Sequence, residues 1–140
     1  MNSFRFHAPV EVRYADLDTM RHVNNATYLT YIEQARSYYL EEACQWDWKQ
    51  WGMVLAKTDI DYRHQIQFHN KPDVWIRTSR LGNSSITQDV IIAELGKPEL
   101  VYAKAKVILV HIDYKTSRPL PLPQVVRQRL TAYEPAEISA

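Results

Sequence analysis

Apolar residues recur at every third or fourth position between Asn25 and Cys44, and polar residues fill the positions between them. Neither glycine nor proline interrupts this stretch. Asn24 or Asn25 suits the N-cap, because a short side-chain carbonyl can accept a hydrogen bond from an N–H of the first turn. The pattern predicts one amphipathic helix, about 30 Å long. Its apolar face contains Tyr28, Tyr31, Ile32, Ala35, Tyr38, Tyr39 and Ala43.

From residue 53 onward the hydrophobic period changes from 3.6 to 2, which is typical of half-buried strands. An earlier alternating run begins at Phe4 and predicts a first strand that ends near Ala15. Short turns rich in Gly, Pro and Asn separate the later runs, so consecutive strands should be antiparallel neighbours. These four predicted strands cover residues 57–70, 74–81, 85–95 and 100–112.

The predicted order is one strand, one long helix and four antiparallel strands, which indicates an α+β domain of two layers with a curved sheet around the helix. We expect residues 1–140 to form a single domain, with a short helix over residues 124–133 and a frayed tail over residues 134–140. A five-stranded sheet of this size leaves a long edge open. We therefore expect a symmetric dimer in which an edge strand of one chain pairs with that of the other.

Composition narrows the function without identifying it. The chain has 140 residues, 46% of them hydrophobic and 24% charged, and a net charge of +1, which is ordinary for a globular protein and argues against nucleic-acid binding. The single cysteine, Cys44, can form no internal disulfide and no thiolate metal site. We expect a cytoplasmic protein with no membrane partner, because no signal-peptide core or membrane-length apolar run occurs.

The candidate chemistry lies in the turn before the long helix. Asp18 precedes the helix start by six or seven residues, with His22 and Asn24 between them. A carboxylate aimed at a carbonyl whose oxygen rests on the first N–H groups of a helix could support acyl transfer. The alternative is that Asp16 and Asp18 only cap the backbone of their own turn.

Other ionisable residues are weaker candidates for the reaction. His22 could orient the acid, although a lone histidine is more often a polar loop residue. Glu33 lies more than two turns into the helix, where pairing with Arg36 three residues later is the favoured interpretation. The nucleophile elbow, phosphate loop, dinucleotide and zinc-protease patterns are absent from the sequence.

Several of these residues together resemble a known family, the hotdog-fold acyl-CoA thioesterases related to 4-hydroxybenzoyl-CoA thioesterase. The likeness extends over most of residues 10–123. Its motifs are Tyr14-x-Asp16-x-Asp18, His22-Val23-Asn24-Asn25 with Tyr28, Glu33-x-x-Arg36, Ile60-x-Tyr62, Leu81-Gly82-x-x-Ser85 and Asp113-x-x-Thr116-x-Arg118-Pro119.

This resemblance implies a hotdog fold, dimers that join two sheets edge to edge, and active sites at the subunit interface. It assigns Asp18 as nucleophile or general base, the N–H of Asn25 as oxyanion donor and His22 as a supporting residue. The predicted substrate-binding residues are Asn24, Tyr28, Gly82, Asn83, Ser84, Ser85 and Arg118.

The sequence departs from the family pattern at two places. Arg21 stands where many members have glycine, so the turn must avoid a positive φ or accept strain. The turn at residues 82–84 lacks the arginines that some members place near the coenzyme A phosphates. Arg80, Lys115 or Arg118 would then have to supply that charge.

The resemblance favours an acyl-CoA thioesterase that needs no metal or bound cofactor and acts on an aromatic or medium- to long-chain acyl group. Three alternatives stay open. They are a thioesterase for acyl carrier protein, a non-catalytic acyl-CoA-binding module, and a dehydratase of the same fold. The protein is expected to be a homodimer or homotetramer.

Overall fold

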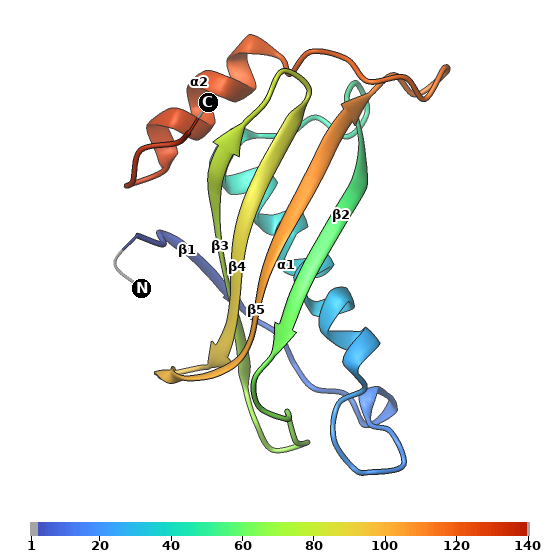
Figure 1. Cartoon of the computed structure of the whole chain (residues 1–140), viewed down its shortest axis with the longest axis vertical. Helices are drawn as coiled ribbons and strands as arrows, with labels where there is room; N and C mark the ends of the chain where they lie inside the picture. The colour runs from blue at the N-terminus through green and yellow to red at the C-terminus, as the bar shows by residue number, and fades with distance from the viewer. Residues whose placement is uncertain (1–2, 140) are drawn as a thin grey trace.

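The computed structural model describes residues 3–139, which fold into an antiparallel sheet curved around one long helix (Figure 1). The strand order across the sheet is β1-β3-β4-β5-β2, so the predicted α+β two-layer architecture is confirmed. No helix among residues 3–139 is long and apolar enough to cross a membrane. The elements are β1 (Phe6–Pro9), the 3₁₀ turn η1 (Tyr14–Asp16), α1 (Asn25–Cys44), β2 (Gly52–Tyr62), β3 (Pro72–Leu81), β4 (Ser85–Glu94), β5 (Lys97–Ile112) and α2 (Gln124–Tyr133).

Helix α1 begins and ends where the sequence predicts. The side-chain oxygen of Asn24 accepts a hydrogen bond from the N–H of Ala26 at 2.9 Å, which caps the first turn. Gln45 ends the helix in the left-handed conformation, with φ of 49°. Tyr38 differs from the prediction, because its side chain points to solvent and is 53% exposed. The buried face consists of Tyr28, Tyr31, Ile32, Ala35, Tyr39, Leu40, Ala43 and Cys44.

Strands β3, β4 and β5 agree with the predicted ranges to within a few residues, but β1 and β2 do not. β1 stops at Pro9, and the chain then turns through η1 instead of continuing as a strand to residue 15. β2 stops at Tyr62, because the N–H groups of Arg63 and His64 both turn to the carbonyl of Tyr102. The next alternating apolar residue, Ile66, is buried from a loop and not from a strand.

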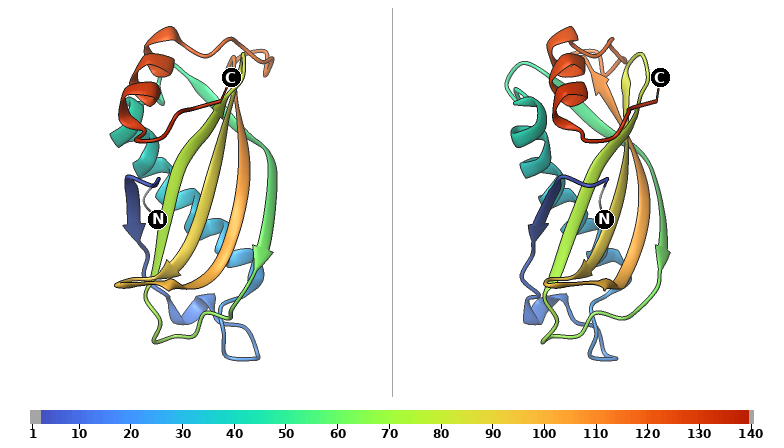
Figure 2. Two further views of the ribbon diagram at one scale, coloured as in Figure 1. Left: turned by 60° about the vertical axis from the view of Figure 1, so that its left-hand side comes forward. Right: turned by 90° about the vertical axis from the view of Figure 1, so that its left-hand side faces the viewer.

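The C-terminal tail, for which the sequence predicts fraying, packs against the sheet over residues 134–139. Ser139 exchanges backbone hydrogen bonds of 3.0 Å with Ser79 and Leu81 of β3. Glu134 is buried and accepts a hydrogen bond from the Tyr39 hydroxyl at 2.6 Å. Figure 2 shows α2 beside the C-terminal part of α1. The prediction for Ala140 lies outside the described residues.

The long edge of the sheet is β2, which pairs with β5 on one side only. Its side chains are mostly exposed, including Val54 and Leu55 at 43% and 48%. An open strand with exposed apolar side chains suits pairing with another chain. Pairing of two copies at this edge stays a prediction.

Candidate active site

The turn between η1 and α1 is closed by its own backbone. The N–H of Asp18 donates to the carbonyl of His22, and the N–H of Arg21 donates to the carbonyl of Asp18, both at 3.0 Å. The N–H of Val23 donates to Ile66 at 2.7 Å, which fastens the turn to the loop after β2. The sequence left two options for the turn at Arg21, a backbone without a positive φ or a strained one. The structure has the strained backbone, because the φ of Arg21 is 64°.

Asp16 and Asp18 lie two residues apart but have different surroundings. Asp16 is buried and accepts hydrogen bonds from the N–H and guanidinium of Arg13 and from the Tyr31 hydroxyl at 2.7 Å. Burial by itself would raise the pKa of Asp16, but the hydrogen bonds from Arg13 and Tyr31 outweigh it and hold that pKa below its usual value. Asp16 is therefore a structural carboxylate that fixes η1 to α1.

Asp18 keeps one carboxylate oxygen free. Oδ1 accepts the N–H of Met20 at 2.8 Å, so the backbone-capping interpretation holds for this oxygen. Oδ2 lies 3.8 Å from Nδ1 of His22, beyond hydrogen-bond distance, and has no hydrogen-bond donor among residues 3–139. The side chain of Asp18 is 30% exposed, so the free oxygen can meet a substrate.

A pocket of about 670 Å³ opens beside this carboxylate. It draws on two segments, the turn before α1 and the loop after β2, which lie far apart in the sequence. Its aromatic wall is formed by Tyr14 and Phe68, whose rings meet edge to face at 6.3 Å. The lining residues are Tyr14, Leu17, Asp18, Arg21, Gln67, Phe68 and His69.

The first turn of α1 offers one unused donor. The N–H of Ala26 is taken by the Asn24 side chain and that of Thr27 by the Asn24 carbonyl. The N–H of Asn25, in contrast, has no acceptor among residues 3–139. This is the amide that the family resemblance assigns to an oxyanion, although Asn25 does not line the pocket of Asp18 in a single chain.

Tyr28 and Asn24 have structural contacts in this chain. Tyr28 is 2% exposed, its hydroxyl donates to the carbonyl of His64, and its ring packs edge to face on Tyr62. The Asn24 side chain is occupied as the helix cap. Neither residue lines the pocket, and their predicted contacts with substrate stay predictions.

The remaining predicted substrate residues lie at the opposite end of the sheet (Figure 1). Ser85 pairs with Val110, whereas Tyr62, which donates to the Asn25 carbonyl, pairs with Ala103 near the other end of β5. The two levels are separated by roughly 23 Å along β4. A single chain therefore does not bring its own Asp18 together with Gly82, Asn83, Ser84, Ser85 and Arg118.

Sequence reasoning missed residues at both ends of the molecule. At the Asp18 end, it placed Phe68 on a strand and did not foresee that Tyr14, Phe68 and His69 meet. At the other end, the guanidinium of Arg127 in α2 donates to the carbonyls of Gly82 and Asn83. The available signal for Phe68 was an apolar residue directly before the polar turn at residues 69–73.

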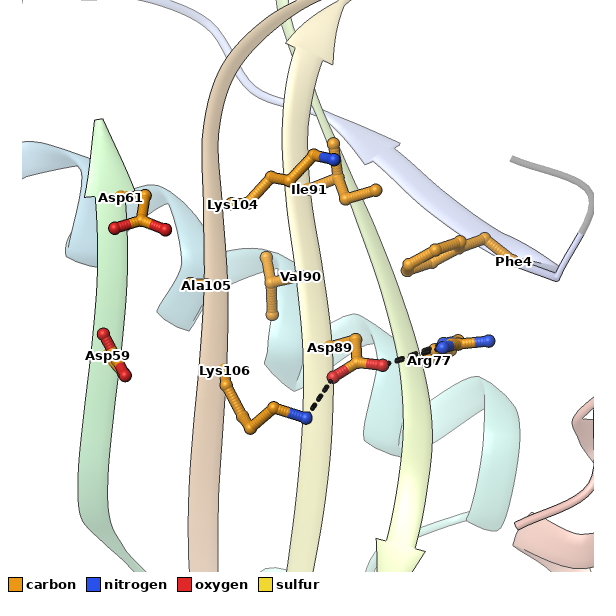
Figure 3. A pocket seen from close by; sticks show the side chains of 10 residues that line it. All are labelled: Phe4, Asp59, Asp61, Arg77, Asp89, Val90, Ile91, Lys104, Ala105 and Lys106. Atoms are coloured by element: carbon orange, nitrogen blue, oxygen red, sulfur yellow. Dashed lines mark hydrogen bonds and ion pairs between the residues drawn. The ribbon is translucent and has the colours of Figure 1, made fainter. Parts of the chain in front are cut away.

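A second hollow of about 390 Å³ lies on the outer face of the sheet, away from α1 (Figure 3). Its central acid, Asp89, forms ion pairs of 2.9 Å with both Arg77 and Lys106. Asp59 and Asp61 of β2 lie along its margin. The hollow contains none of the predicted site residues. The carboxylate of its central acid is already paired with two cations.

Comparison with known proteins places the chain in a family. Residues 12–130 match the model of the thioesterase-like superfamily, and this match covers most of the chain. The chain belongs to the thioesterase-like superfamily. Its fold is the hotdog fold of this family, and its class of enzyme is thioester hydrolase.

The chain is also similar to individual proteins. The chain is 33% identical to the long-chain acyl-CoA thioesterase FadM of Escherichia coli over 126 residues, which cover 86% of this chain and 93% of FadM. It is 34% identical to YsmA of Bacillus subtilis over 86 residues, 61% of this chain and 58% of YsmA. A thioesterase from Thermus thermophilus, solved in complex with coenzyme A and Zn, is 33% identical, covers 99% of this chain and 100% of its own, and superposes with a TM-score of 0.85.

Proposed function

We propose that this thioesterase-like protein hydrolyses acyl-CoA thioesters with Asp18 as the reacting carboxylate. The observation that carries the proposal is the free Oδ2 of Asp18 in a pocket beside the start of α1. The likeness to FadM, a long-chain acyl-CoA thioesterase, supports coenzyme A as the leaving group. The likeness to a thioesterase solved with coenzyme A supports it as well.

Hydrolysis adds water across the thioester C–S bond, so that the carbonyl carbon gains oxygen and the sulfur leaves as the thiol of coenzyme A. Asp18 can act in two ways. Either its oxygen attacks the carbonyl carbon and expels the coenzyme A thiolate, giving a mixed anhydride that water then hydrolyses, or it takes a proton from a water molecule that attacks the carbonyl carbon. Both routes need a carboxylate oxygen that no other group occupies. In both, negative charge develops on the carbonyl oxygen, for which the N–H of Asn25 is the proposed donor.

Tyr14 and Phe68 make an aromatic wall that suits an aromatic or a medium- to long-chain acyl group. Asp18 lies at the same pocket, so an acyl group on this wall would hold its thioester carbonyl near the carboxylate. His22, 3.8 Å from Asp18, is proposed to orient the acid. The acyl preference of this chain then depends on the pocket and not on the buried tyrosines of α1.

We further propose that two copies pair at the β2 edge and that the active site is completed at their interface. The separation of Asp18 from the turn at residues 82–84 within one chain supports this arrangement. A partner chain could supply that turn, together with Arg118, to the coenzyme A half of the substrate. The mass measured by light scattering should then be that of a dimer or a larger oligomer. A Val54→Lys variant on the β2 edge should lower this mass toward that of the monomer.

The function is tested by the hydrolysis of a panel of acyl-CoA thioesters, aromatic and aliphatic, with free thiol as the readout. Asp18→Asn should lower kcat by about 10²- to 10⁴-fold, because it removes the base or nucleophile. Asparagine still accepts the N–H of Met20, so the turn should keep its shape. Asp47→Asn is a matched control, because Asp47 accepts the N–H of Lys49 in the same way at 3.0 Å but lies in the loop after α1.

The outcomes separate the alternatives. Equal rates for wild type and Asp18→Asn would contradict the role of Asp18. Binding of acyl-CoA without hydrolysis across the panel would favour a non-catalytic binding module. Faster hydrolysis of acyl carrier protein thioesters than of acyl-CoA thioesters would favour a carrier-protein thioesterase. Hydration of enoyl thioesters would favour a dehydratase.

A further inference from the structure

Arg21 combines an unusual backbone with an unpaired charge. Its φ of 64° lies in the left-handed region, where a side chain costs free energy and glycine does not. The turn is closed on both sides of this residue, because the N–H of Arg21 donates to the carbonyl of Asp18 and the carbonyl of His22, directly after it, accepts the N–H of Asp18. The backbone explains the left-handed φ, but it does not explain why the residue is arginine.

Two other residues with a positive φ occupy ordinary structural positions. Gln45, at 49°, forms the C-cap of α1, and its N–H donates to the carbonyls of Glu41 and Leu40. Ser117, at 58°, closes the turn onto Asp113. Neither places a cation beside a pocket, so the arginine at position 21 calls for a separate explanation.

Arg21 lines the pocket of Asp18. Its guanidinium makes no hydrogen bond and no ion pair with any of residues 3–139. A guanidinium in such a position keeps all its donors for a ligand. Arginine binds carboxylate and phosphate oxygens in particular, often through two parallel hydrogen bonds.

We propose that Arg21 binds a negatively charged group of the thioester substrate and thereby sets which substrates the enzyme prefers. The inference rests on the proposed function. The charged group belongs either to the coenzyme A half, as a phosphate, or to the acyl half, as a carboxylate. In both cases Arg21 contributes to binding, and Asp18 carries out the chemistry.

The decisive variant is Arg21→Gly. Glycine fits a φ of 64° without strain, so the variant should keep the melting temperature of wild type or raise it. Its KM for the preferred thioester should nevertheless rise about tenfold, because a charge-assisted hydrogen bond is lost. Its kcat should change little. Arg21→Lys keeps the charge but loses the planar guanidinium, so its KM should lie between the KM values of wild type and Arg21→Gly.

Gln45→Gly is the matched control. It relieves a left-handed residue of the same kind at the C-cap of α1, which does not line the pocket. It should change KM less than twofold. A defect confined to Arg21→Gly therefore reports the lost guanidinium and not a general effect of glycine on the fold.

Three thioesters identify the source of the charge: an acyl-CoA, the same acyl group on pantetheine, and an acyl-CoA with a terminal carboxylate. A KM rise for both coenzyme A substrates but not for the pantetheine thioester assigns Arg21 to a phosphate. A rise only for the carboxylated acyl group assigns it to the acyl half. An unchanged KM for all three overturns the proposal.

Failure of the proposed function would look different. In that case wild type hydrolyses none of the three thioesters, and calorimetric binding of the same compounds replaces the kinetic readout. Weaker binding by Arg21→Gly would then support the role of Arg21 independently of hydrolysis. Equal binding of all three compounds by the two proteins would overturn it.

Discussion

The turn before α1 and the outer face of the sheet both carry carboxylates beside a hollow, but they use them differently. On the outer face, Arg77 and Lys106 donate to both oxygens of Asp89. Burial alone would raise the pKa of Asp89, but these two cations outweigh it and hold that pKa below its usual value. In the turn, a single backbone N–H reaches Asp18, and one oxygen stays free.

The difference indicates which hollow can bind and react with a substrate. A carboxylate that is already paired with two cations has little capacity left for a ligand, and its ion pairs would have to break first. Asp18 needs no such rearrangement. Its neighbour Asp16 shows that the same turn can also hold a fully engaged acid, because Arg13 and Tyr31 satisfy both of its oxygens.

The largest effect on stability is expected at Asp16. Asp16→Ala removes a buried acceptor and leaves the Tyr31 hydroxyl unpaired, so the free energy of unfolding should fall by about 2 kcal/mol. Asp18→Ala, which loses one solvent-exposed hydrogen bond, should cost about 1 kcal/mol or less. Urea unfolding of both variants measures the contrast. A larger loss of stability for Asp18→Ala would reverse the assigned roles.

The next effect is the dependence of stability on pH. The pKa of Asp16 is lowered in the folded protein, so the unfolded chain binds protons more readily at acidic pH. The stability from Asp16 is therefore fully present above the unfolded pKa near 4. It is lost as pH falls through the lower, folded value.

Thermal unfolding between pH 7 and pH 2 tests this dependence. Asp16→Asn, which cannot ionise, should lose less stability than wild type as pH falls. Parallel curves for wild type and Asp16→Asn would mean that Asp16 has no part in acid unfolding.

Local patterns predicted the fold well where a single element determines its own geometry. The period, the Asn24 cap and the absence of Gly and Pro located α1, and the turns around Gly82 and Gly96 located β3, β4 and β5. The end of β2 was missed, because Ile66 continues the alternation even though the chain has left the sheet. A period of two cannot distinguish a continuing strand from a loop residue that enters the core.

The candidate site was predicted only in part for a similar reason. Asp18 was a candidate from its spacing to the helix start, because both belong to one stretch of sequence, but its role was assigned only by the family resemblance and stays a prediction. The wall of Tyr14 and Phe68 could not be found, since it forms only when two distant segments meet. The packed tail is a comparable case, because burial of Glu134 depends on Tyr39, 95 residues away.

The smallest effect is expected on the outer face. Asp89→Asn breaks two ion pairs of a side chain that is 23% exposed, so we expect a loss of about 1 kcal/mol in low salt. The loss should shrink in about 1 M salt, because screening weakens exposed pairs. Asp59→Asn is the matched control, since Asp59 borders the same hollow and forms no ion pair with any of residues 3–139. Thioester hydrolysis should be unchanged in both variants. A loss of activity in Asp89→Asn alone would contradict the site at Asp18 and would indicate that the reaction takes place on the outer face of the sheet.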